Sequence, residues 1–389
     1  EKPFAGVNGS GKHNNWSMST DTGVNLLDPG STPAENGQFI LFLTAVIKAV
    51  DEYQDLLRMS VASAGNDHRL GANEAPPAIV SMFLGEELTE VIDALEHDVK
   101  YRGKGKQVMK LGVDTLPDLP KDTTDRNRTS PFAFTGNKFE FRMLGSTFSI
   151  AGPNIIINTI VADALRGFAD ELEAAPDFNA ALHDLVVRTI KEHKRIIFNG
   201  NNYTDEWTKE AKKRGLLNLR NSAEALPHFA DKKNIEMFER NQVFTEREVV
   251  TRTEIMLENY SKVLTIEALT MIEMGKKDIY PAVNEYILEL CKVIRSKKAA
   301  CEDIDVSAEQ AAVKKLSAAN EAMYGKIGEI EQLLVDVKGC EGAEATAKFF
   351  ADKIIPVMQE MRAYADEMEL NTAKKYWPFP TYGDILFSV

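Results

Sequence analysis

The stretch Lys138-Phe139-Glu140-Phe141-Arg142 decides how this chain folds. It alternates charged and aromatic residues, which is the pattern of a strand that buries one face. Side chains two positions apart lie on the same face of a strand, about 6.6 Å apart. We therefore expect the two phenylalanines to anchor the strand in a core. The three charged side chains then form a row on the opposite face.

Helical periodicity surrounds this strand. Apolar residues recur at helical spacing from Phe39 to Leu57, behind a helix-start sequence, Thr32-Pro33-Ala34-Glu35. Further helices are expected over 79–100 and 157–172, and a second strand over 107–113. From about residue 179 helical periodicity dominates, with capping-box sequences at 245–248 and 307–310. We expect an α+β fold whose later part is a helical bundle packing on itself, rather than a coiled-coil partner helix.

Length and composition bound the class of protein. The 389 residues exceed what one hydrophobic core supports, so two lobes or domains are expected. With 46 basic and 59 acidic residues the net charge is −13, which disfavours nucleic-acid binding. The densest apolar run, residues 155–161, is too short to span a membrane. Three cysteines without CxxC spacing argue against a disulfide framework or a zinc site and favour the reducing cytoplasm: Cys291, Cys301 and Cys340.

A glycine-rich segment opens the chain. Gly6 to Lys12 matches the first part of a nucleotide-binding P-loop, but His13 stands where that motif needs Ser or Thr. The residues after His13 alternate like a strand, whereas a P-loop opens a helix, so the sequence excludes a P-loop. The glycines would expose backbone N–H groups to a ligand, and the His13 imidazole could bind a metal. An ordinary Gly-Ser-Gly turn would have the same sequence. Because a ligand loop usually rests on earlier structure, we expect this chain to be the later part of a longer polypeptide.

Other charged segments allow two interpretations each. The row on the predicted strand could hold a divalent ion at Glu140 while its cations bind anionic oxygens, or it could be a solvated edge. Arg126 and Arg128, on a long loop, suit phosphate binding. Glu74 precedes two prolines that would present it rigidly. Each of these loops also fits an ordinary solvated surface.

Taken together and in this order, the motifs resemble the glutamine synthetase family, and most of all its large type III enzymes. The resemblance rests on three runs of sequence: NGSGKHNNWS at 8–17, RLGANEAPPA at 69–78, and DRNRTSPFAFTGNKFEFR at 125–142. It covers roughly residues 1–170. It implies a catalytic-domain portion over 1–178, with a curved antiparallel sheet and packed helices, followed by a mainly helical extension over 179–389.

The resemblance also implies a role for each matching residue. His13 and Glu140 would bind Mg²⁺ or Mn²⁺ beside ATP. The glutamate substrate would be held by a second group: Asn8, Gly9, Arg69 and Arg142. The ATP contacts would be Asn15, Ser17, Lys138 and Arg128. Arg128 would also stabilise the transferring phosphoryl group, and Glu74 would accept a proton from ammonium. Asn15 stands where commoner enzymes of the family have a second histidine.

The implied reaction joins ammonia to the side-chain carboxylate of glutamate through a γ-glutamyl phosphate. The family implies a homo-oligomer, a dodecamer of hexameric rings, with no nucleic-acid or membrane partner. One histidine and one glutamate are too few ligands for the metal sites, so we expect this 389-residue chain to be inactive by itself. Two alternatives stay open: a ligase of the same fold that joins glutamate to a larger amine, and a helical scaffold protein.

Overall fold

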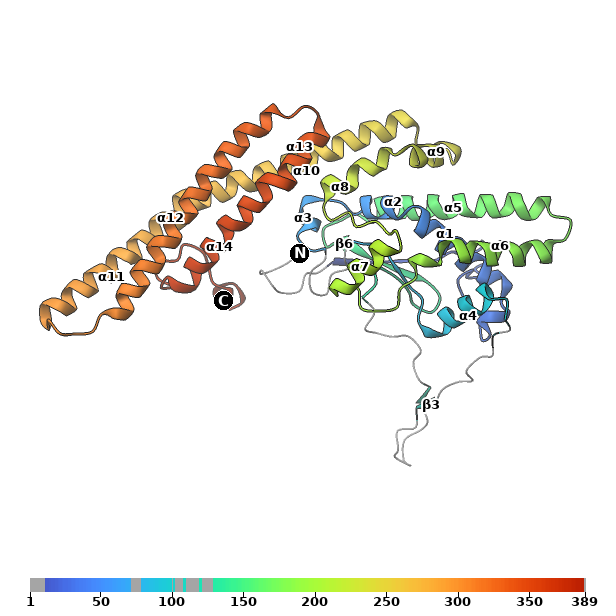
Figure 1. The fold of residues 1–389 in the computed structure, drawn as a ribbon, viewed down its shortest axis with the longest axis horizontal. Helices are drawn as coiled ribbons and strands as arrows, with labels where there is room; N and C mark the ends of the chain where they lie inside the picture. Colours follow the sequence, from blue (N-terminus) through green and yellow to red (C-terminus); the bar gives the residue numbers. More distant parts are fainter. Residues whose placement is uncertain are drawn as a thin grey trace. The chain divides into compact units, whose positions relative to one another are not determined.

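A computed structural model describes residues 11–70, 78–99, 101, 108–109, 119–120 and 129–387. Its contacts divide the chain into two compact units, Glu1–Thr253 and Glu254–Val389. Unit 1 mixes strands and helices, and unit 2 is helical (Figure 1). The chain is therefore of the predicted α+β class. The domain boundary predicted after residue 178 does not coincide with this division after Thr253, and it stays a prediction.

A four-stranded sheet runs through unit 1 in the order β1-β6-β5-β2. Its strands are β1 (Gly11–Trp16), β2 (Met82–Phe83), β5 (Phe132–Phe134) and β6 (Phe139–Gly145). Strand β6 pairs antiparallel with β1 and with β5, in keeping with the antiparallel sheet that the resemblance implies, whereas β2 pairs parallel with β5. Parallel neighbours need a long crossover, and the segment between β2 and β5 provides one. A separate antiparallel pair consists of β3 (Val108–Met109) and β4 (Leu119–Pro120).

Helices pack around this sheet, and α5 and α6 run side by side with α1 against both (Figure 1). The helices of unit 1 before the sheet's last strand are α1 (Gly37–Glu52), α2 (Gln54–Met59), α3 (Ala64–Asp67) and α4 (Glu86–Glu96). Those after it are α5 (Ala151–Ala174), α6 (Phe178–His193), α7 (Asp205–Lys213), α8 (Ser222–Ala225) and α9 (Lys232–Arg240). Short 3-10 turns cover Pro33–Glu35, Lys194–Ile196 and Leu226–Ala230.

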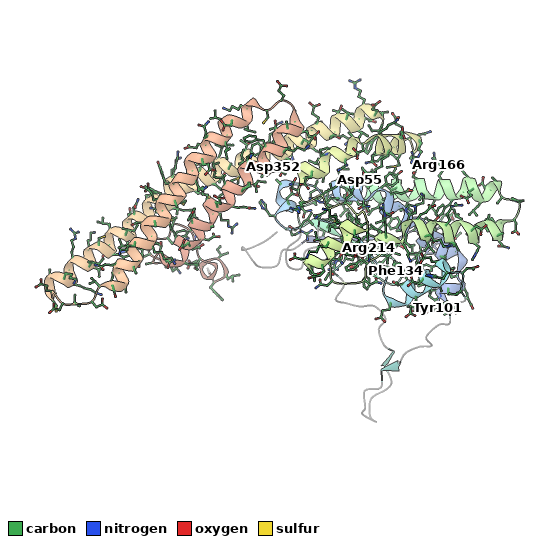
Figure 2. The ribbon with its side chains drawn as sticks, viewed as in Figure 1. Asp55, Tyr101, Phe134, Arg166, Arg214 and Asp352 are labelled. Carbon is green, nitrogen blue, oxygen red and sulfur yellow. The ribbon has the colours of Figure 1, made fainter. Side chains whose placement is uncertain are left out.

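Aromatic rings form the core beneath the sheet. Phe139 and Phe141 are fully buried, as the alternation predicted. The ring of Phe132 stacks on Phe139 with centroids 4.9 Å apart and lies 5.9 Å from Phe141. Phe134, labelled in Figure 2, meets Phe139 edge-on at 5.2 Å. These contacts fix which face of β6 points away from the core.

Two helix predictions need correction. The helix expected over 79–100 begins only at Glu86, because Gly85 takes a left-handed φ of 85° and ends an extended run. That run, from Ile79 to Leu84, is buried on both faces and includes β2, so its apolar character, interrupted only by Ser81, marks a buried strand. The helix expected from Phe39 to Leu57 is confirmed in its buried face but divides at Tyr53 into α1 and α2. Strand β3 and helix α5 confirm the expectations for 107–113, where 108–109 are described, and for 157–172.

Two of the three predicted helix starts are confirmed, since α10 begins at Glu246 and α12 at Ser307, but only α10 has the predicted capping box. At the start of α10, Glu248 accepts from the Thr245 N–H at 2.9 Å and donates its own N–H to the Thr245 hydroxyl at 3.4 Å, a reciprocal capping box. Thr32 starts only a 3-10 turn, and α1 is capped by the Asn36 side chain instead. Ser307 does not cap α12, because its hydroxyl donates backward to Asp305 at 3.1 Å.

Unit 2 is built mainly of long helices, and α12 packs against both α11 and α14. The helices from residue 246 onward are α10 (Glu246–Met274), α11 (Tyr280–Ala300), α12 (Ser307–Asp336), α13 (Ala343–Phe349), α14 (Ile355–Asn371) and α15 (Tyr382–Leu386). A 3-10 turn, Val337–Gly339, follows α12. No helix among the described residues has the length and apolar character that a bilayer crossing requires.

Two widened π turns interrupt these long helices, at Gly275–Ile279 and Phe350–Ile354. Each ends just before a helix with proline in its first turn, Pro281 in α11 and Pro356 in α14. Proline has no N–H to donate and its ring clashes with the carbonyl one turn earlier. An extra residue in the turn relieves that clash, which explains why both π turns occur where they do.

A polar network joins α5 to the end of α9. The Asp163 carboxylate accepts from Arg240 Nε and Nη2, each at 2.6 Å, from Asn241 at 2.8 Å and from the Tyr53 hydroxyl at 3.2 Å. Burial alone would raise the pKa of Asp163, but these donors outweigh it and hold the pKa below its usual range. The carboxylate therefore stabilises the folded chain when it is ionised.

We expect Asp163→Asn to lower the free energy of unfolding of unit 1 by about 1–2 kcal/mol at pH 7, since Arg240 is partly exposed. A group with a lowered folded pKa contributes its full stability above its unfolded pKa and loses it as pH falls through the folded pKa. The difference between wild type and variant should therefore shrink below about pH 4. Urea unfolding at several pH values measures this. Glu171→Gln, which breaks an exposed pair with Arg188, is the control and should cost less than about 0.5 kcal/mol.

Candidate functional site

The candidate site lies on the face of β1 and β6 that points away from the aromatic core. Asn15 is directly opposite Glu140, and the register then slips, so that His13 faces both Arg142 and Met143. Such a β-bulge re-aims a side chain and is frequent beside active sites. On β1, His13 and Asn15 are exposed whereas their neighbours Asn14 and Trp16 are buried. The strand pairing thus places His13, Asn15, Glu140 and Arg142 on one face.

His13 and Glu140 meet on this face. His13 Nδ1 lies 3.8 Å from Glu140 Oε2. That separation is too long for a hydrogen bond. Two atoms each about 2.1 Å from an octahedral ion lie about 3.0 Å apart at 90°, so a shared cation would draw these two groups slightly closer together. The imidazole is half exposed and the carboxylate is 17% exposed, so a cation can reach both.

Two asparagines of α5 hold β1 in place from behind. Asn14 Nδ2 donates to Asn154 Oδ1 at 2.7 Å, and the Trp16 indole N–H donates to Asn158 Oδ1 at 2.8 Å. Both β1 side chains are buried. Because these bonds fix the alternate residues of β1 against the helix, His13 is held pointing to the opposite face.

Arg69 reaches the same strand pair from the turn after α3. Its side chain is 2% exposed, and Nη2 donates to the Leu144 carbonyl of β6 at 2.9 Å. The same nitrogen lies 3.5 Å from the carbonyl of Arg142. The structure therefore places the predicted substrate arginine at the end of β6, next to the residue Arg142 that shares its predicted role.

Ser17 and Lys138 lie together at the other end of the strand pair. The Ser17 hydroxyl is 2.9 Å from both Asn25 Oδ1 and the carbonyl of Asn137, the residue before Lys138. Lys138 is partly exposed. The Asn15 side chain donates to the His13 carbonyl at 3.4 Å. The three predicted ATP contacts that the structure describes thus follow the same β1–β6 edge as His13 and Glu140.

Comparisons with known proteins bear on this geometry. A family model described as glutamine synthetase C-terminal domain matches residues 181–298. Over its whole length the chain is 46% identical to a glutamine synthetase of Butyrivibrio fibrisolvens, 43% to a type-3 glutamine synthetase of Dictyostelium discoideum, and 37% to a glutamine synthetase of Bacteroides fragilis. The chain is thus similar to glutamine synthetases along its whole length. It spans about half the length of these relatives, between 54% and 56% of each.

Four residues assigned by the likeness to glutamine synthetases lie outside the described residues: Asn8, Gly9, Glu74 and Arg128. The others are brought to one strand pair from segments far apart in the sequence. The ligand and substrate roles of all of them stay predictions, because no ligand contact tests them. Their shared location is what the glutamine synthetase likeness requires.

A second group of possible metal ligands was not anticipated from the sequence. Ligand atoms of Asp55, His228 and Asp231 lie within 4.8 Å of one another, and Asp55, from α2, is labelled in Figure 2. The buried Asp55 carboxylate already pairs with Lys233 at 3.0 Å and accepts from Asn234 at 2.9 Å. His228 is hydrogen-bonded to Asp231 at 2.7 Å. Lys233 supplies the positive charge that an ion would bring, so this group is better explained as an ion-pair network.

The asparagines that support the site were likewise not predicted from the sequence. Asn154 and Asn158 hold β1, and Asn66 contacts Arg69. The spacing of the two α5 asparagines, four residues apart, puts them on one helix face, but only the position of β1 shows what that face contacts.

Proposed function

We propose that the protein carrying this chain joins ammonia to the side-chain carboxylate of glutamate at the expense of ATP and so forms glutamine. The observation that carries the proposal is the 3.8 Å approach of His13 to Glu140 on the open face of the sheet. The likeness to glutamine synthetases supports it, because the matching relatives bear the name of that enzyme.

The reaction needs the kind of site that this face offers. A carboxylate is a poor electrophile, and conversion to an acyl phosphate gives ammonia a leaving group to displace. Phosphoryl transfer is catalysed mainly by positioning and by neutralising negative charge. We propose that His13 and Glu140 hold Mg²⁺ or Mn²⁺, whose charge neutralises phosphate oxygens when it is bound. An imidazole nitrogen with a carboxylate oxygen is a donor set that Mn²⁺ accepts readily and Mg²⁺ less so.

The remaining residues would position the two substrates. Arg142, beside Glu140, and Arg69 would bind carboxylate oxygens of glutamate together with Asn8 and Gly9. The ATP contacts would come from four residues: Asn15, Ser17, Lys138 and Arg128. Arg128 would also stabilise the transferring phosphoryl group. Glu74 would take the proton that ammonium must lose before it can attack.

The assembly and its surroundings belong to the same proposal. We infer that residues 1–178 are the later part of the catalytic domain and that 179–389 form its helical extension, a C-terminal bundle. The family model that begins at residue 181 supports this boundary. We also infer a dodecamer of hexameric rings working in the cytoplasm. The three cysteines, all without a disulfide partner among the described residues, are compatible with a reducing compartment.

The test is an assay of the complete encoded polypeptide with ATP, glutamate, ammonium and either Mg²⁺ or Mn²⁺. We expect glutamine and ADP in equal amounts, and no product without the divalent ion. The assay is repeated with larger primary amines in place of ammonium. Turnover with a larger amine but not with ammonium would reject glutamine synthesis in favour of another γ-glutamyl ligase, and absence of ATP turnover with every amine would favour a scaffold.

A further inference from the structure

Hydrogen bonds within unit 1 hold the guanidinium group of Arg69. Arg69 Nε donates to Asn66 Oδ1 at 3.1 Å, and Nη2 donates to the Leu144 carbonyl at 2.9 Å. Arg69 is 2% exposed and Asn66 is 1% exposed. Buried arginines are rare unless their donors are matched by acceptors. The orientation of this guanidinium is therefore set by its neighbours.

Asn66 connects Arg69 to β6 through all parts of its amide. Its Nδ2 donates to the carbonyls of Val61 and Met143, each at 2.8 Å, while Oδ1 accepts from Arg69. Met143 is one of the two residues that face His13 at the bulge. No other side chain of this size has two donors and an acceptor on one planar group, since aspartate lacks the donors and leucine lacks both. Asn66 thus fixes Arg69 relative to the strand that carries Glu140.

Gly11 provides the space that the guanidinium occupies. A Cβ atom at position 11 would lie 2.7 Å from both Cζ and Nη1 of Arg69 and 2.5 Å from the Leu144 carbonyl. Real Cβ atoms do not approach other atoms so closely, and the Leu144 contact is with backbone, which cannot move aside. Nη1 and Cζ are the guanidinium atoms nearest to this position. That end of Arg69 therefore lies beside Gly11 itself.

We propose that Asn66 and Gly11 are positioning residues for Arg69 and that they set the affinity for the carboxylate of the amino-acid substrate. This inference rests on the proposed function, in which Arg69 binds glutamate. Asn66 acts through its amide, by holding Nε, and Gly11 acts by its lack of a side chain. The contacts of Asn66 and Gly11 described above are with Arg69 and with backbone, so we expect their influence to fall mainly on the amino-acid substrate.

The test compares Asn66→Ala and Gly11→Ala with wild type in the complete polypeptide. We expect the KM for glutamate to rise about 10–100-fold in each variant, because small misplacement of a binding group has effects of that size. The KM for ATP should stay within about twofold. Asn234→Ala is the matched control. Asn234 is also a fully buried asparagine of unit 1 that donates to Asp55 and to a carbonyl, so its loss should lower the melting temperature without changing either KM.

A double-mutant cycle with Arg69→Lys separates positioning from general destabilisation. If Asn66 acts through Arg69, adding Asn66→Ala to Arg69→Lys should change the glutamate KM by less than about twofold. Full additivity of the two changes, or an unchanged glutamate KM in both single variants, would overturn the inference while leaving the proposed function intact.

Chemical modification of arginine gives a readout that does not depend on activity. Phenylglyoxal should modify Arg69 slowly in wild type and at least several-fold faster in folded Asn66→Ala, as measured by mass spectrometry of the Arg69 peptide. If wild type makes no glutamine but Arg69 becomes reactive in the variant, the proposed function fails and the positioning role stands. If Asn66→Ala does not fold, Asn66→Ser, which leaves a smaller cavity, provides the same comparison. Equal protection of Arg69 in the folded variants contradicts the positioning role.

Discussion

Replacing His13 or Glu140 with alanine is expected to lower kcat for the proposed glutamine formation by about 10²–10³-fold in the complete polypeptide. The two side chains lie 3.8 Å apart on the open face of β1 and β6 and are proposed to share one divalent ion. Removing either leaves the ion with one fewer protein ligand, so the apparent Mn²⁺ affinity should fall in both variants. Initial rates across a Mn²⁺ titration measure kcat and the half-saturating concentration together.

His183 offers a matched control for this experiment. It also faces a carboxylate, with Nε2 3.3 Å from Asp98 Oδ1, but both side chains are well exposed and lie away from β1 and β6. His183→Ala should therefore leave kcat and the Mn²⁺ titration unchanged. If His13→Ala keeps wild-type metal dependence, then a shared ion at this pair is wrong, whatever the activity of the enzyme.

The meeting of His13 with Glu140 shows what the sequence could predict. Alternation over 138–142 predicted which face of β6 is buried, and the strand-like residues after His13 excluded a P-loop. Neither pattern predicts that β1 pairs with β6, because pairing partners far apart in sequence leave no local signal. The resemblance to glutamine synthetases supplied that link, by assigning both residues to one ion.

The corrected elements show where local patterns mislead. Residues 79–84 were predicted to be helical because a short apolar run that is buried on both faces shows neither helical nor strand periodicity. Only the left-handed backbone at Gly85 separates that strand from α4. Ser307 matches a capping sequence, yet Asp305 binds its hydroxyl first. In each case a neighbour in space or a backbone angle decided between two structures that the sequence allowed equally.

Phe139→Ala is expected to lower the free energy of unfolding of unit 1 by about 3–5 kcal/mol. The ring is fully buried, stacks on Phe132 at 4.9 Å and meets Phe134 at 5.2 Å, so its removal leaves a cavity between two strands. That loss is a large part of a typical total of about 5–15 kcal/mol. Urea unfolding followed by the fluorescence of Trp16 and Trp207 reports on unit 1.

A Trp377→Phe background removes the signal of unit 2 from this measurement, and Phe178→Ala serves as control. Phe178 is 55% exposed at the start of α6, so its loss should cost less than about 0.5 kcal/mol. A cost below about 1 kcal/mol for Phe139→Ala would mean that these rings do not form the core.

The Phe139→Ala substitution should also affect the candidate site, because Phe139 is paired with Trp16 of β1 and precedes Glu140. A folded Phe139→Ala variant should therefore bind Mn²⁺ more weakly than Phe178→Ala, since loosening the buried face of β6 also loosens the carboxylate on its other face.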